Sequence, residues 1–197
     1  MLSKLSAPRA ALVLAALAIP SALMTNFFVY VPGTDDFPKL AGAPLLPGIY
    51  FGLVLAIGVL LWGKAGALEF LAVLVGTIVA WILAFRTALS VHDFVNGLHA
   101  GAIGAGSRKL PAFAIAGVVA GLVGSLGSAV AVAIASAGFR AHSDWLRTIA
   151  LGTVAGALLY FGDEPYGTFL PLFVVWQMTV AASVAYGLAG SRPKRKR

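Results

Sequence analysis

The chain has 197 residues, of which 60% are hydrophobic and only 11% are charged. Its mean hydropathy is +0.94, whereas a soluble domain carries about 25% charged residues, so an ordinary water-soluble fold is excluded. Cysteine is absent, which excludes disulfides, thiolate metal sites and cysteine nucleophiles.

Six segments are long and apolar enough to cross a bilayer, whose hydrocarbon core needs about 20 helical residues. Each must be a helix, because lipid offers no partner for an unpaired backbone group. The six spans cover about residues 10–30, 43–62, 66–89, 111–137, 145–161 and 169–190. The sequence therefore predicts an all-α fold, a polytopic helical bundle that forms one membrane domain over residues 1–197 and ends in a basic tail at 191–197.

The first span follows Lys4 and Arg9 and contains Pro20. A secretory signal is one interpretation, but a signal's apolar region is about 7 to 15 residues long, and this run continues to Tyr30. We therefore expect an uncleaved helix with a kink at Pro20, where the proline ring removes one backbone hydrogen bond.

Lysine and arginine are distributed unevenly between the two sides of the predicted bundle. If the N-terminus is cytoplasmic, ten of these residues lie on the inner side and four lie on the outer side. Cytoplasmic loops are enriched in both residue types. We therefore predict that both ends of the chain are cytoplasmic, in a cell membrane that we expect to be a bacterial inner membrane.

Under this topology, most of the carboxylates and two of the three histidines fall on the outer side. They are Asp35, Asp36, His92, Asp93, His99, Asp163 and Glu164. One interpretation is that loops between helices are wet and simply carry such residues. The other is a vestibule that attracts cations or binds a solute, which we extend inward with Trp81, Trp176 and Gln177.

Residues 90–109 are too polar to cross the membrane and too apolar for a simple loop. In a helix, His92, Asn96 and His99 would share one face, but the glycines that follow disfavour a regular helix. We expect a re-entrant segment or an amphipathic helix at the interface between the third and fourth spans. Zinc suits imidazole and carboxylate ligands, although seven residues of helix separate His92 and His99 by about 10 Å; a pH-sensitive lid is the other hypothesis for this segment.

The middle of each span lacks charged residues, which argues against proton pumping through a buried carboxylate. Gln177 is the strongest polar candidate at depth, and an interhelical hydrogen bond is its alternative role. Glycines at helical spacing predict close packing of the fourth and fifth spans through Gly117, Gly121, Gly124, Gly152 and Gly156.

The catalytic motifs that we sought are missing. Ser125 and Ser128 superficially suggest an intramembrane serine protease, but no histidine follows His142. No phosphate-binding loop or HExxH motif is present, so we do not expect an enzyme, and the sequence identifies no cofactor. The basic tail suits the anionic inner leaflet better than nucleic acid, which we do not expect as a partner.

In layout, the chain resembles the substrate-binding S-components of energy-coupling-factor vitamin transporters, which are small six-helix proteins with a ligand site opening outward. Ala11 and Ala15 match the small-residue spacing with which such proteins dock on a coupling subunit. We expect an integral membrane protein that binds or transports a small solute or cation through a site on the extracytoplasmic face. The alternative is a non-transporting accessory or assembly subunit that packs against a larger membrane partner or another copy of itself.

Overall fold

A computed structural model of the chain describes residues 2–30, 38–101, 112–162 and 168–191. Its helices are α1 (Ala7–Tyr30), α2 (Leu45–Trp62), α3 (Ala67–Gly101), α4 (Ala112–Ala135), α5 (His142–Gly156) and α6 (Leu170–Gly190). A 3-10 helix, η4 (Ala157–Gly162), continues α5. Within the described residues, six helical segments are long and apolar enough to cross a membrane, with α5 and η4 together forming the fifth. An all-α, multi-pass membrane fold is therefore supported.

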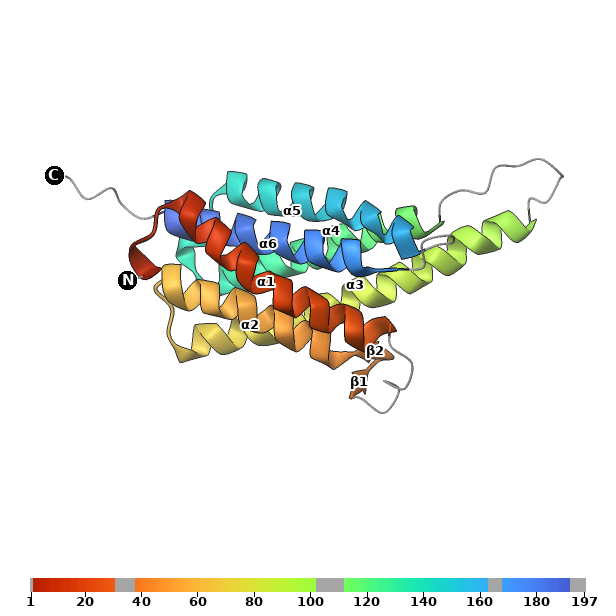
Figure 1. The fold of residues 1–197 in the computed structure, drawn as a ribbon, viewed down its shortest axis with the longest axis horizontal. Coiled ribbons are helices and arrows are strands. Elements are labelled where there is room, and N and C mark those ends of the chain that lie inside the picture. Colours follow the sequence, from red (N-terminus) through yellow and green to blue (C-terminus); the bar gives the residue numbers. More distant parts are fainter. Residues whose placement is uncertain (1, 31–37, 102–111, 163–167, 192–197) are drawn as a thin grey trace.

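The helices lie side by side, and both termini are at the same end of the bundle (Figure 1). We call this the terminal end and the opposite one the distal end. The most extensive helix–helix contacts are those of α3 with α4, α1 with α6, α2 with α3, and α4 with α5. The distal end is formed where α1, α3 and α5 finish and where α2, α4 and α6 begin.

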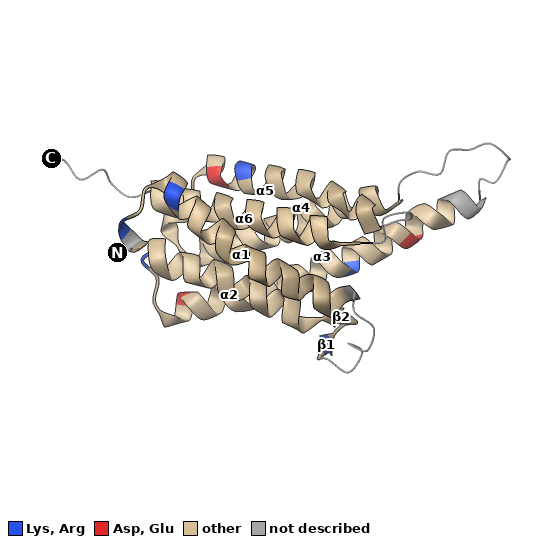
Figure 2. Ribbon diagram, in the orientation of Figure 1, with Lys and Arg blue, Asp and Glu red and all other residues tan. Residues whose placement is uncertain are grey.

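Charged side chains lie near the two ends of the bundle and leave its middle free of them in the part that the structure describes (Figure 2). Arg9 lies at the start of α1, Lys64 just after α2, and Glu69 and Asp144 in the first turns of α3 and α5, all toward the terminal end, whereas Arg86 and Asp93 lie in the distal half of α3. This distribution suits a bundle that presents its middle to hydrocarbon and its ends to water.

Helix α3 is longer than the sequence analysis expected. Its apolar run was predicted to end at Leu89, with a re-entrant or interfacial segment beyond, but residues 90–101 continue the same helix; residues 102–109 lie outside the described part. At 35 residues and about 1.5 Å per residue, α3 is about 50 Å long, well above the core thickness of about 30 Å. Its last turns therefore project beyond the bundle at the distal end (Figure 1).

A small hairpin precedes α2 at the distal end. Strands β1 (Lys39–Leu40) and β2 (Ala43–Pro44) pair antiparallel, and the two residues between them, Ala41 and Gly42, both have positive φ. Two-residue hairpins favour such turns because their twist matches that of the strands. The hairpin fixes Pro44, whose carbonyl oxygen accepts a 2.7 Å hydrogen bond from the Trp81 indole of α3.

Several large apolar side chains are fully buried in the half of the bundle toward the terminal end. Leu14 of α1, Val59 of α2, and Val184 and Leu188 of α6 are fully buried. Phe139, between α4 and α5, is also fully buried.

Candidate functional site

A chamber of about 390 Å³ lies within the distal half of the bundle. Helices α1, α3, α4 and α6, together with the end of α5 and η4, contribute to its wall. Its ring-bearing lining residues are Trp81, Phe85, His92, Phe113, Phe169, Phe173 and Trp176. The volume lies within the range of about 300–1,000 Å³ that is typical of small-molecule sites.

The chamber exists because small residues face large ones across it. Helix α3 contributes Ala84 and Ala88 at i, i+4 spacing, and α4 contributes Gly117, Ala120 and Gly121 on one face. On α6, by contrast, the lining includes the large rings of Phe173 and Trp176. The space between them is therefore left open.

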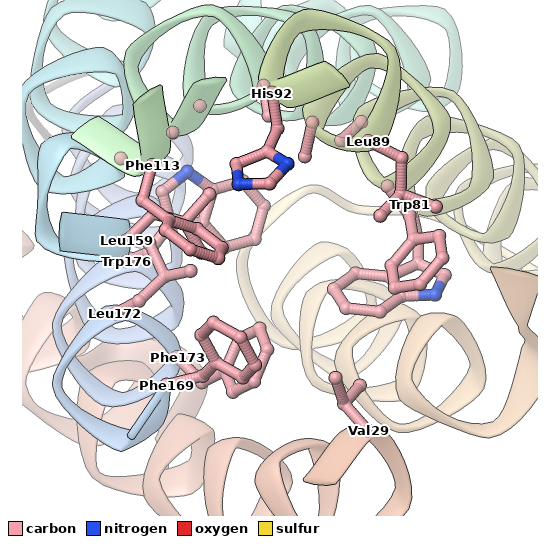
Figure 3. A pocket seen from close by; sticks show the side chains of 17 residues that line it. Val29, Trp81, Leu89, His92, Phe113, Leu159, Phe169, Leu172, Phe173 and Trp176 are labelled. Atoms are coloured by element: carbon pink, nitrogen blue, oxygen red, sulfur yellow. The ribbon is translucent and has the colours of Figure 1, made fainter. Parts of the chain in front are cut away.

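Aromatic rings form a continuous band around the chamber (Figure 3). Along the band, successive ring centroids are 4.3 to 6.3 Å apart, in the order His92, Phe113, Phe169, Phe173, Trp81 and Phe85. Such separations are favourable for tilted aromatic pairs. The rings therefore brace one another around the space instead of collapsing into it.

Trp176 forms the floor of the chamber. Its indole is 8% exposed and packs against Phe51 of α2, with ring centroids 5.3 Å apart. Its edge lies so close to Gly124 that a Cβ on that glycine would be 2.9 Å from the indole Cζ2. Beyond Trp176 toward the terminal end, Val180 and Val184 of the same helix are fully buried, so the described side chains close the chamber below.

His92 is the one ionisable residue among the described lining residues. Its side chain is 25% exposed. The Asn96 amide nitrogen lies 3.1 Å from His92 Nε2, and Asp93 Oδ1 lies 3.4 Å from His92 Nδ1. The same Asn96 nitrogen lies 3.4 Å from His92 Nδ1, so both ring nitrogens have polar neighbours on α3 itself.

Gln177 lies outside the chamber lining. It is fully buried, and its amide nitrogen donates a 2.8 Å hydrogen bond to the Thr25 hydroxyl of α1. Thr25 in turn donates to the Ser21 carbonyl oxygen at 2.9 Å. Gln177, which we expected to line the deep part of the site, therefore links α6 to α1 instead. Trp81 and Trp176, which we expected to line it as well, do line the chamber.

The remaining polar site residues from the sequence analysis are only partly placed. His92, Asp93 and Asn96 lie together on α3. Asp35, Asp36, Asp163 and Glu164 lie outside the described residues, as does the side chain of His99. Within the described chain, no three histidine or acidic side chains are grouped so that they could hold a metal ion.

The glycines behave as two groups. A Cβ at Gly117 would overlap the Gly156 carbonyl oxygen, and one at Gly121 would be 2.5 Å from the Gly152 carbonyl oxygen. Helices α4 and α5 thus touch backbone to backbone at these four positions. Gly124 instead faces Trp176 and Ala84, so it accommodates the chamber floor.

Sequence reasoning missed most of the aromatic wall, namely Phe85, Phe113, Phe169 and Phe173. A signal is present in the spacing, since Trp81 and Phe85 are four residues apart, as are Phe169 and Phe173, with Trp176 three residues further on. Such residues share a helix face. Every face of these helices is apolar, however, so the sequence alone does not tell which face points inward.

Comparison of the chain with protein-family models, with curated proteins and with solved structures finds no match. Function is therefore inferred from the chain's own residues and their arrangement.

Proposed function

We propose that this integral membrane protein binds a small solute in the distal chamber and presents or carries it across the membrane. The observation that carries the proposal is the chamber itself, about 390 Å³ of unfilled space between the distal parts of the helices. Protein interiors normally fill such space, because each void forfeits dispersion contacts. A maintained chamber is more readily explained by an occupant than by structural need.

The chamber opens on the extracytoplasmic face in this proposal. Both termini lie at the opposite end (Figure 1), and with that end cytoplasmic, ten of 14 basic residues lie on the inner side. The positive-inside rule supports this orientation. It gives a site that receives its solute from outside the cell.

The closed floor favours a binding protein or carrier over an open pore. A continuous path would have to pass Trp176 and then the buried segment around Val180 and Val184. Passage through the bundle therefore requires a second conformation, in which the Trp176 indole leaves its position against Gly124 and Phe51.

Single cysteines test both access and orientation, because the natural chain has no cysteine. Ala88→Cys and Ala120→Cys place a thiol on the chamber wall, and Ala181→Cys is the matched control at a fully buried position of α6. In right-side-out vesicles, a membrane-impermeant maleimide should label the first two variants and spare the third. Labelling only from the cytoplasmic side would overturn the orientation, and no labelling from either side would favour the accessory-subunit function.

A further inference from the structure

We infer that the chamber selects for a neutral, apolar body and rejects ions, an inference that rests on the proposed function. This specificity follows from what the wall offers a ligand. Among the described lining residues there is no lysine, arginine, aspartate or glutamate, and no hydroxyl group.

The few polar atoms of the wall are already engaged or covered. The Trp81 indole N–H is bonded to the Pro44 carbonyl oxygen, and both nitrogens of His92 face partners on its own helix, Asp93 and Asn96. The Trp176 indole nitrogen has no partner among the described residues, but it is buried beneath the chamber surface. A ligand inside the chamber therefore meets carbon almost everywhere.

Arg86 and Asp93, the described charged residues in the distal half of α3, face away from the chamber. Asp93 is 81% exposed, and the Arg86 guanidinium lies against Gly42 of the hairpin, where an added Cβ would be 3.4 Å from its Nη1. An ion that entered would lose its hydration without gaining a countercharge from the described lining residues, and desolvating an unpaired charge is very costly. The carboxylates that suggested a cation preference from sequence, Asp35, Asp36, Asp163 and Glu164, lie outside the described residues, so the inference rests on the chamber wall.

The size of the chamber indicates the size of the occupant. An apolar cavity of about 150 Å³ is sufficient for benzene, so about 390 Å³ accommodates a body of two or three rings or a folded acyl chain. His92 marks the one place at the rim where a single polar group of the ligand could lie. A free ring compound and a lipid acyl chain both offer an apolar body with one polar group. The experiment below distinguishes these two sources of ligand.

The test uses the full chain, purified in detergent, with a matched set of probes: 2-naphthol (neutral), 2-naphthoate (anionic), 2-(aminomethyl)naphthalene (cationic) and decanol (acyl-like). Thermal unfolding is followed at fixed detergent concentration. A probe that binds only the folded state at ten times its Kd should raise Tm by about 3–6 °C. We expect this for 2-naphthol or decanol and not for either charged probe, and the stronger of the two neutral probes identifies the source of the ligand.

Two variants separate binding in the chamber from partition into the micelle. Ala120→Phe fills the chamber and should abolish the shift, whereas Ala150→Phe, on the exposed face of α5, should retain it. An equal or larger shift with a charged probe, lost in Ala120→Phe, would overturn the apolar specificity while leaving the binding function intact. If no probe shifts Tm but chamber cysteines are labelled from outside, the specificity is also overturned; if the cysteines are unreactive as well, the binding function itself fails.

Discussion

Within the single helix α6, Val180, Val184 and Leu188 are fully buried, whereas Phe169 and Phe173, two to three turns earlier, line a chamber. The terminal part is packed by small and branched side chains, whereas aromatic rings that contact one another line the chamber in the distal part. Lipid is as apolar as these side chains, so the hydrophobic effect does not force membrane helices together. Packing in each half is therefore set by specific side-chain contacts. The chamber can persist because the aromatic rings in its wall pack against one another.

The two halves also differ in how their helices are joined. At the terminal end, a polar clamp connects α5 to α6: the Arg147 guanidinium is 2.8 Å from Asp144 Oδ1 and donates to the Ser183 hydroxyl at 3.2 Å. It also lies over the Tyr186 ring, 4.5 Å from its centroid. In the distal half, α5 meets α4 through glycine backbones. The wall of the chamber thus depends on the close contact between the α4 and α5 backbones. At the terminal end, α5 is joined to α6 by hydrogen bonds instead.

The largest effect should come from adding one methyl group to the wall of the chamber. In Gly117→Ala, the new Cβ would overlap the Gly156 carbonyl oxygen, which belongs to a helix backbone and cannot rotate away. Overpacking costs about 1–3 kcal/mol and occasionally more, and we expect a loss of about 3 kcal/mol or failure to fold. Unfolding in mixed micelles measures it.

Gly97→Ala is the matched control. Nothing lies within 4 Å of a Cβ at Gly97, and alanine is better than glycine in a helix by about 0.5–1 kcal/mol. This variant should therefore be slightly more stable than the natural chain. Equal losses in the two variants would mean that the backbone contact between α4 and α5 does not hold the wall.

Removing the clamp should have the next largest effect. Asp144 is 8% exposed, so Arg147→Met leaves a buried carboxylate without its partner. Breaking a buried pair costs about 3–5 kcal/mol, and because the arginine side chain is 32% exposed we expect about 2–3 kcal/mol. The double variant Asp144→Asn/Arg147→Met should recover part of the loss; if it is as unstable as the two single variants added together, the pair is not coupled.

The helices were largely predictable from sequence, but the end of α3 and the chamber were not. Apolar runs located the spans within a few residues. The distal turns of α3 carry polar residues and glycine, yet they remain helical; there Val95 is 5% exposed and His92 packs on Phe113 at 4.3 Å between centroids, so tertiary contact outweighs local propensity. The rest of the chamber wall could not be predicted, because Phe85, Phe113 and Phe173 do not differ in polarity from residues that face lipid.

One substitution made in both halves tests the difference between them directly. Ala181→Leu adds three carbons to a fully buried position of the packed half and should cost about 1–3 kcal/mol. Ala120→Leu adds the same atoms where the chamber has room and should leave the unfolding free energy within about 0.5 kcal/mol of the natural chain. Comparable costs at both positions would show that the chamber is filled in the protein as it exists.

The smallest effect is expected at Gln177. Its two candidate roles, an interhelical link and a lining residue of the chamber, predict different results there. As a link between α6 and α1, its hydrogen bond to Thr25 should contribute about 0.6 kcal/mol, the average measured for such bonds in membranes. Gln177→Leu and Thr25→Val should therefore each cost about this amount, and the double variant should cost no more than either alone. Because Gln177 does not line the chamber, neither change should alter the Tm shift produced by 2-naphthol or decanol. A lost shift in Gln177→Leu, with stability unchanged, would return this residue to the binding site and extend the chamber past Trp176.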